Sequence, residues 1–127
     1  MRIVIESGFP YVEAIIIFNG KELNLGKVII DTGSSSTIFK ADKVADIEIL
    51  LESNDSIHRI CGVGGSEFVF TKQLEKLQIG DLSVTNFQIE IGAMDYGFDI
   101  DGIIGMDFLL KVKAIIDLGK LVIHSSS

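Results

Sequence analysis

An acidic residue directly after an apolar segment is the first candidate for chemistry in this sequence. Residues 29–37 read I-I-D-T-G-S-S-S-T, so Asp31 ends an isoleucine pair and precedes a threonine, a glycine and a cluster of hydroxyl groups. A carboxylate removed from water is costly in free energy unless something compensates for its charge. The segment is therefore either an ordinary polar turn or part of an active site, and the rest of the sequence decides between the two.

Two further segments contain glycines in patterns that indicate specific structures rather than ordinary loops. Residues 61–66 read C-G-V-G-G-S, between two short apolar runs, and this pattern predicts a hairpin with a glycine-rich tip at Val63, Gly64 and Gly65. Residues 101–109 read D-G-I-I-G-M-D-F-L, a buried apolar stretch that leads into a short helix. A lone D-T-G is a weak signal, but the three segments together in one short chain are specific.

In this order and at these separations, the three segments resemble the retropepsin-like aspartic proteases, which comprise the retroviral proteases and their single-domain cellular and bacterial relatives. The resemblance extends from about residue 11 to residue 124. It implies an all-β fold, a closed or partly open β-barrel with one short C-terminal helix and a flap hairpin, as a single domain over residues 1–127. It also implies an aspartic endopeptidase with Asp31 as its catalytic residue.

The family's chemistry needs two facing carboxylates, whereas this chain carries one D-T-G. The resemblance therefore implies a homodimer to which each chain contributes one Asp31. Two carboxylates about 3 Å apart share one proton, because both cannot ionise cheaply. The ionised acid takes a proton from the attacking water, and the protonated acid donates to the oxygen of the scissile carbonyl. The acid after the apolar strand is then tolerated because its partner is an identical acid that carries the proton.

Three residues after Asp31 acquire supporting roles from the resemblance. Thr32 would hydrogen-bond the second loop across the two-fold axis. Gly33 would bring its amide close to the carboxylates, in a conformation open to few other residues. Ser34 would hydrogen-bond the outer oxygen of Asp31, as serine does in pepsin-like enzymes.

The two glycine-containing segments acquire roles in the same way. Val63, Gly64 and Gly65 match a flap that opens for an extended peptide and then closes over it as an added strand. The segment Ile103, Ile104 and Gly105 would pack beneath the catalytic loop, with Gly105 allowing two backbone segments to cross closely. One departure concerns the next position, which is Met106 here and an arginine in retroviral enzymes. The terminal strands that join the retroviral dimer also have no clear match.

The remaining pattern predicts the elements that must position these residues. Short Ile- and Val-rich runs separated by glycines are typical of a small all-β domain. We expect strands at 11–18, 23–30, 37–39, 57–61, 67–71, 73–79, 82–91, 114–117 and 120–124, and helices at 41–49 and 106–112. Turns are expected at Asn19-Gly20, Gly80-Asp81 and Leu118-Gly119.

Composition excludes several classes of function. The net charge of −7 and a pI of about 4.7 disfavour nucleic acid and anionic membrane surfaces as partners. No apolar run approaches the length of a membrane span, and the first residues lack the apolar core of a signal peptide. One cysteine, Cys61, permits no intrachain disulfide. We therefore expect a cytoplasmic protein, and the resemblance implies that its substrate is a peptide or protein.

Other candidate sites favour structural interpretations. Asp95, Asp99 and Asp101 lack the spacing of a calcium loop and are expected to form a solvated acidic loop, so no metal and no cofactor is implied. Cys61 is expected to be a small apolar residue rather than a redox switch. His58 and His124 have no nucleophile motif to serve. The alternative function is a catalytically silent module of the same fold that binds peptides or dimerises.

Overall fold

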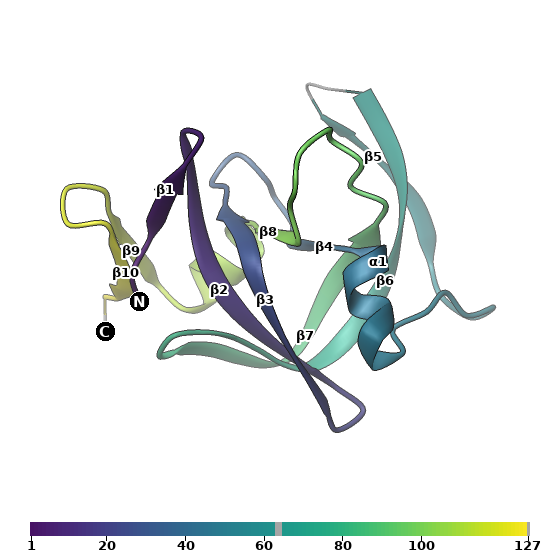
Figure 1. Ribbon diagram of the computed structural model, residues 1–127. Helices are drawn as coiled ribbons and strands as arrows, with labels where there is room; N and C mark the ends of the chain where they lie inside the picture. The colour runs from purple at the N-terminus through teal and green to yellow at the C-terminus, as the bar shows by residue number, and fades with distance from the viewer. Residues whose placement is uncertain (63–64, 127) are drawn as a thin grey trace.

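The computed structural model describes residues 1–62 and 65–126, and strands dominate it (Figure 1). The strands are β1 (Val4–Glu6), β2 (Phe9–Phe18), β3 (Lys21–Ile30), β4 (Ile38–Lys40), β5 (Ile57–Gly62), β6 (Gly65–Ile79), β7 (Leu82–Gly92), β8 (Gly102–Ile104), β9 (Ala114–Asp117) and β10 (Val122–Ser125). The helices are α1 (Ala41–Val44), a 3-10 turn at Ala45–Ile47, and α2 (Met106–Lys111).

The main sheet closes on itself. Its strand order is β1-β2-β3-β8-β4-β7-β6-β5, and an additional pairing of β2 with β6 joins the two sides. The irregular ring therefore consists of β2, β3, β8, β4, β7 and β6. The strands β1 and β5 extend from this ring as edge strands. The predicted all-β fold with a partly open barrel and a short C-terminal helix is confirmed.

Local sequence explains the hairpin from which the ring starts. Asn19 and Gly20 have φ values of 49° and 76° between β2 and β3, and this pair suits the twist of a two-residue hairpin. Alternating residues of β2, including Val12, Ala14 and Ile16, are buried in the main core. Burial of one face of the strand fixes its register, because a shift by one residue would expose that whole face.

The strand β6 is longer than predicted. Residues 67–71 and 73–79 belong to one continuous strand that pairs with β5, β7 and β2. The expected break falls at Lys72, which is 7% exposed. Its Nζ lies 2.6 Å from Glu52 and 2.8 Å from Asp55, so ion pairs with the preceding loop allow a lysine to be buried within the strand.

Other elements also differ from the prediction: β2 and β3 each begin two residues earlier than expected, and β8 was expected only as a buried apolar stretch. The helix expected at 41–49 is one α-helical turn and one 3-10 turn, which end at Glu48 in the left-handed conformation with φ 63°. The strand β1 was not predicted. The final hairpin of β9 and β10 is confirmed, although β10 begins at Val122 rather than at residue 120.

The two ends of the chain lie side by side (Figure 1). The amide of Ile3 donates to the carbonyl of Leu121 at 2.8 Å, and the amide of Ile123 donates to the carbonyl of Met1 at 2.9 Å. The first residues are therefore hydrogen-bonded to the C-terminal strand of the same chain. Within residues 1–62 and 65–126, no helix is long and apolar enough to cross a membrane.

Candidate active site

The loop that carries Asp31 is held between two strands by a third. The strand β8 lies between β3 and β4, parallel to β3 and antiparallel to β4. Ile103 pairs with Ile29 before the loop and with Ile38 after it. The strands that enter and leave the loop are therefore fixed to one shared neighbour, and this gives the Asp31 loop a rigid base.

The segment that follows β8 crosses directly beneath the loop. The amide of Asp31 donates to the carbonyl of Ile104 at 2.9 Å, and the amide of Met106 donates to the carbonyl of Ser34 at 2.8 Å. Between these bonds, a Cβ on Gly105 would lie 2.4 Å from the carbonyl oxygen of Ser36 and 2.9 Å from that of Ser34. The structure thus has the close backbone crossing that was expected at Gly105.

Asp31 is partly exposed, and its carboxylate is bonded within its own loop. The amide of Gly33 donates to Oδ1 of Asp31 at 2.8 Å, and a Cβ on Gly33 would lie 3.1 Å from that oxygen. The φ of Gly33 is not in the left-handed region, so proximity to the carboxylate, rather than an unusual conformation, favours glycine here. Thr32 and Gly33 are exposed, and the proposed bond of Thr32 to a second chain stays a prediction.

The expected role of Ser34 is wrong in this structure. Its hydroxyl donates to the carbonyl of Ser36 at 2.7 Å rather than to the outer oxygen of Asp31. A hydroxyl has one proton to donate, so the bond to Ser36 excludes the other. Ser34 therefore stabilises the turn of the loop.

A buried threonine and an aspartate join the loop to α2. Thr37 is fully buried, and both its amide and its hydroxyl donate to the carboxylate of Asp107, at 3.1 and 2.7 Å. The amide of Gly105 donates in turn to the hydroxyl of Thr37 at 3.1 Å. The position after Met106 therefore supplies an acidic anchor within the chain, one residue beyond the position at which retroviral enzymes have an arginine.

We expect the change Asp107→Ala to lower the free energy of unfolding by about 2–4 kcal/mol, because it leaves buried donors of Thr37 without an acceptor. Asp107→Asn keeps one acceptor oxygen and should lose less. Urea denaturation of both variants measures the difference, with Asp81→Ala in an exposed turn as the control. A loss below about 0.5 kcal/mol in Asp107→Ala would show that the anchor contributes little.

The hairpin that should form the flap comprises β5 and residues 65–71 of β6, and is called the flap hairpin below. Its strands pair from Ile57 with Phe70 to Gly62 with Gly65. Gly65 has φ 125°, a conformation that L side chains rarely adopt. Two of the three residues expected to contact substrate, Val63 and Gly64, lie outside the described residues.

Glu67 of the flap hairpin contacts the loop between β7 and β8, which rises beside β5 and β6 in Figure 1. One oxygen of Glu67 accepts the hydroxyl proton of Tyr96, and the other accepts the amide proton of Met94 at 3.2 Å. Burial and the bond to Glu67 raise the pKa of Tyr96, so its hydroxyl stays a donor. Phe98 in the same loop stacks on Phe9 with ring centroids 5.3 Å apart.

An apolar cluster separate from the main core lies between these parts. It contains Tyr11, Ile29, Ile38, Val69, Met94 and Ile100, with Ile60 and Ile103 packed against it. It therefore joins the strands beside Asp31 to the flap hairpin and to the loop between β7 and β8.

The acidic loop was expected to be solvated, and this prediction is wrong for Asp101. Asp101 is 7% exposed, and its carboxylate accepts the amide proton of Lys27 at 3.0 Å. The Nζ of Lys43 lies 3.6 Å from the other oxygen of this carboxylate. Asp101 therefore fastens the start of β8 to β3, whereas Asp95 and Asp99 are exposed.

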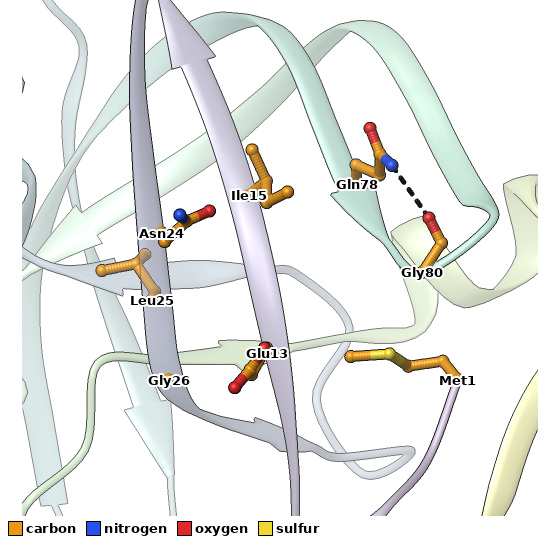
Figure 2. Close-up of a pocket in the computed structure, with 8 residues that line it drawn as sticks. All are labelled: Met1, Glu13, Ile15, Asn24, Leu25, Gly26, Gln78 and Gly80. Carbon is orange, nitrogen blue, oxygen red and sulfur yellow. Dashed lines mark hydrogen bonds between the residues drawn. The ribbon is translucent and has the colours of Figure 1, made fainter.

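A groove of about 520 Å³ is lined by residues outside the Asp31 loop, and Figure 2 shows these residues. It is lined by Met1, Glu13, Ile15, Asn24, Leu25, Gly26, Gln78 and Gly80. Glu13 is the one acidic group among them, and no residue of the Asp31 loop contributes. The groove therefore supplies no carboxylate pair and is not the candidate active site.

Sequence analysis missed three residues that shape the site: Thr37, Asp107 and Glu90. Thr37 and Asp107 lie inside or beside the motifs, but nothing in the sequence pairs them. Glu90 is 7% exposed on β7, and its signal was a charge between Ile89 and Ile91, at the end of the strand where residues 89–92 are all buried. Its partners could be found only from the structure.

Comparisons with known proteins agree with this geometry. A family model described as aspartyl protease matches residues 12–108, most of the chain. The chain therefore belongs to the aspartyl protease family. A retropepsin-like aspartic protease from Rickettsia conorii has a similar structure, with a TM-score of 0.68, 20% sequence identity, and coverage of 97% of this chain and 96% of that one. At this identity the likeness establishes a retropepsin-like fold. No curated protein matches.

Proposed function

We propose that this chain is an aspartic endopeptidase whose catalytic pair consists of Asp31 from two identical chains. Membership of the aspartyl protease family supports protease function in general. The observation that carries the finer proposal is the state of Asp31 in the single chain. Its carboxylate accepts a hydrogen bond from Gly33, and no second carboxylate is bonded to it in the part of the chain that the structure describes. On this proposal, one chain supplies half of a two-acid site.

The local geometry suits the role of Asp31 in the pair. The amide of Gly33 holds Oδ1, which leaves Oδ2 for the second acid or for water. In the dimer the two acids share one proton. The ionised Asp31 takes a proton from the attacking water while the protonated one donates to the scissile carbonyl oxygen, and a tetrahedral intermediate forms without a covalent adduct. Thr32 is exposed, so that it can reach the second loop.

The substrate that we propose is an extended peptide with apolar side chains on both sides of the scissile bond. The apolar cluster described above adjoins the strands beside Asp31 and the flap hairpin. An extended peptide can pair with a hairpin strand through main-chain hydrogen bonds. Cys61 is free and exposed, which suits the cytoplasmic location that we propose for the protein.

The dimer makes a quantitative prediction about dilution. Cleavage of a diverse peptide library at about pH 5 should yield a substrate, and activity per chain should then be measured over a wide dilution series. Below the dimer dissociation constant, mass action predicts a loss of roughly tenfold in activity per chain for each tenfold dilution. Sedimentation of the same samples measures the dimer. Undiminished activity in samples that contain only monomer would overturn the shared site.

Absence of cleavage has two separable meanings. If a confirmed dimer cleaves nothing in the library, the silent peptide-binding or dimerisation module gains support over the enzyme. If only monomer is present, assembly is the missing step, and the same assay is repeated at concentrations where sedimentation detects the dimer.

A further inference from the structure

Glu90 is a buried carboxylate that the proposed chemistry does not use. It is 7% exposed and lies on β7. The hydroxyl of Ser36 donates to its Oε1, and Nε2 of His58 lies in hydrogen-bond contact with its Oε2. A buried carboxylate is tolerated where both oxygens are bonded, and here both partners come from parts of the chain that border the active site.

One end of this contact belongs to the Asp31 loop. Ser36 lies five residues after Asp31, within the same loop. The main chain of Glu90 is fixed at the same place, because its amide donates to the carbonyl of Thr37 at 3.0 Å and its strand pairs with β4 at Ile38. The carboxylate of Glu90 therefore keeps a constant position relative to the loop.

The other end belongs to the flap hairpin. His58 lies on β5, an edge strand whose neighbour in the sheet is β6. In register, His58 is opposite Val69 of β6, and Glu90 is opposite Thr71 of β6. The imidazole and the carboxylate thus meet across β6. This contact ties β5 to the body of the molecule in addition to its backbone bonds.

We propose that Ser36, Glu90 and His58 form a clasp that positions the flap hairpin over the Asp31 loop, and that protonation of His58 tightens it. The role in substrate binding rests on the proposed function, whereas the mechanical role does not. A protonated imidazole makes a charge-assisted bond to a carboxylate, and a neutral imidazole makes an ordinary one. His58 is the positioning residue that can open, because its side chain is 46% exposed while that of Glu90 is 10% exposed.

Other charges on the strands packed around the clasp are engaged elsewhere or make no salt bridge to it. On β6, Glu67 binds Tyr96, and Lys72 binds Glu52 and Asp55. Lys40 of β4 and Arg59 of β5 form no salt bridge with Glu90 in the described ranges 1–62 and 65–126. Among the described residues, His58 is thus the basic side chain bonded to Glu90, and the pH response of the clasp is attributed to this contact.

Amide hydrogen exchange in the full chain tests the clasp without any need for a substrate. We expect His58→Leu to raise the exchange rate of the β5 amides, residues 57–62, about tenfold, which corresponds to about 1.4 kcal/mol of lost protection. Arg59→Leu, on the same exposed strand, is the matched control and should change them less than twofold. Equal exchange in the native chain and His58→Leu, or an equal rise in the control, would overturn the proposal.

The pH dependence of β5 amide exchange distinguishes a bond between His58 and Glu90 from simple packing of the two side chains. After correction for intrinsic rates, protection of β5 in the native chain should fall as the pH rises, because a neutral imidazole bonds a carboxylate less strongly than a charged one does. His58→Lys keeps a cation and should hold the protection constant over the same pH series. Glu90→Gln should also remove the pH dependence. A native profile without pH dependence, or an unchanged profile in His58→Lys, would refute the role of the His58 proton.

Kinetics then connect the clasp to the proposed function. With a cleaved peptide, His58→Leu should raise KM about fivefold or more and leave kcat within about twofold, because the clasp positions the hairpin rather than the reacting groups. An equal loss in kcat would count against a positioning role. If the native chain cleaves nothing, the proposed function fails, while the exchange experiments still decide whether the clasp exists.

Discussion

The change Asp31→Asn is expected to lower peptide cleavage by about 10³-fold or more and to leave the fold and the dimer intact. The amide cannot accept a proton from water, so the general base is lost. The fold should survive because the asparagine oxygen can still accept the amide proton of Gly33, the hydrogen bond that the Asp31 side chain makes within residues 1–62 and 65–126. The replacement therefore removes a proton acceptor with almost no change of shape.

The matched control for this change is Asp81→Asn. Asp81 is exposed in the turn between β6 and β7, so the same loss of a carboxylate should alter activity less than twofold. Both variants are compared with the native chain in cleavage rate, thermal unfolding and sedimentation. Cleavage by purified Asp31→Asn at a tenth of the native rate or above would remove Asp31 from the mechanism.

Mixing native chain with the Asp31→Asn chain tests whether the active site is shared between two chains. Native chain exchanged with an excess of Asp31→Asn should lose activity, because mixed dimers hold one carboxylate. At a ninefold excess, random pairing leaves roughly a tenth of the native chains in a native dimer, so activity should fall about tenfold by mass action. Undiminished activity, after subunit exchange has been verified, would mean that one chain holds a complete site.

An element could be predicted from the sequence when the residues that determine it lie close together in the chain. The Asn19-Gly20 hairpin and the helix that follows Gly105 were predicted well, because turn residues and helix periodicity act over a few positions. The continuous β6 was missed at Lys72, whose burial depends on Glu52 and Asp55 some twenty positions away. The N-terminal pairing with β10 was missed for the same reason, since it joins the two ends of the chain.

The same distinction holds for the residues of the candidate site. Motif matching identified Asp31, Gly33 and Gly105, whose close contacts the structure contains. It assigned the wrong partner to Ser34, because a hydroxyl rotates to whichever acceptor the folded loop presents. The bond between Thr37 and Asp107 spans 70 positions, and a sequence pattern without a registered sheet gives no means of pairing such residues.

The change Gly105→Ala has the second large expected effect, a loss of about 3 kcal/mol or more in the free energy of unfolding, together with loss of cleavage. The new Cβ would lie 2.4 Å from the carbonyl oxygen of Ser36 and 2.6 Å from its carbonyl carbon. Both are main-chain atoms, so no side chain can rotate away, and overpacking of this kind typically costs 1–3 kcal/mol or more. Relief of the clash requires the Asp31 loop to move away from β8.

The expected loss of stability in Gly105→Ala comes from lack of room for a Cβ and not from the backbone conformation of Gly105. Gly105 has φ −100° and ψ −175°, which are extended values that any residue adopts. The matched control is Gly26→Ala in β3, where an added Cβ meets nothing within 4 Å and φ is not in the left-handed region. Denaturant unfolding should place Gly26→Ala within about 0.5 kcal/mol of the native chain.

The pair of glycine variants also separates stability from catalysis. If Gly105→Ala unfolds at lower denaturant and loses cleavage while it remains folded without denaturant, the displaced loop explains both, because the bonds from Asp31 to Ile104 and from Met106 to Ser34 flank the clash. A Gly105→Ala chain as stable and as active as Gly26→Ala would mean that the loop tolerates a wider separation from β8. The position of Asp31 would then not depend on this crossing.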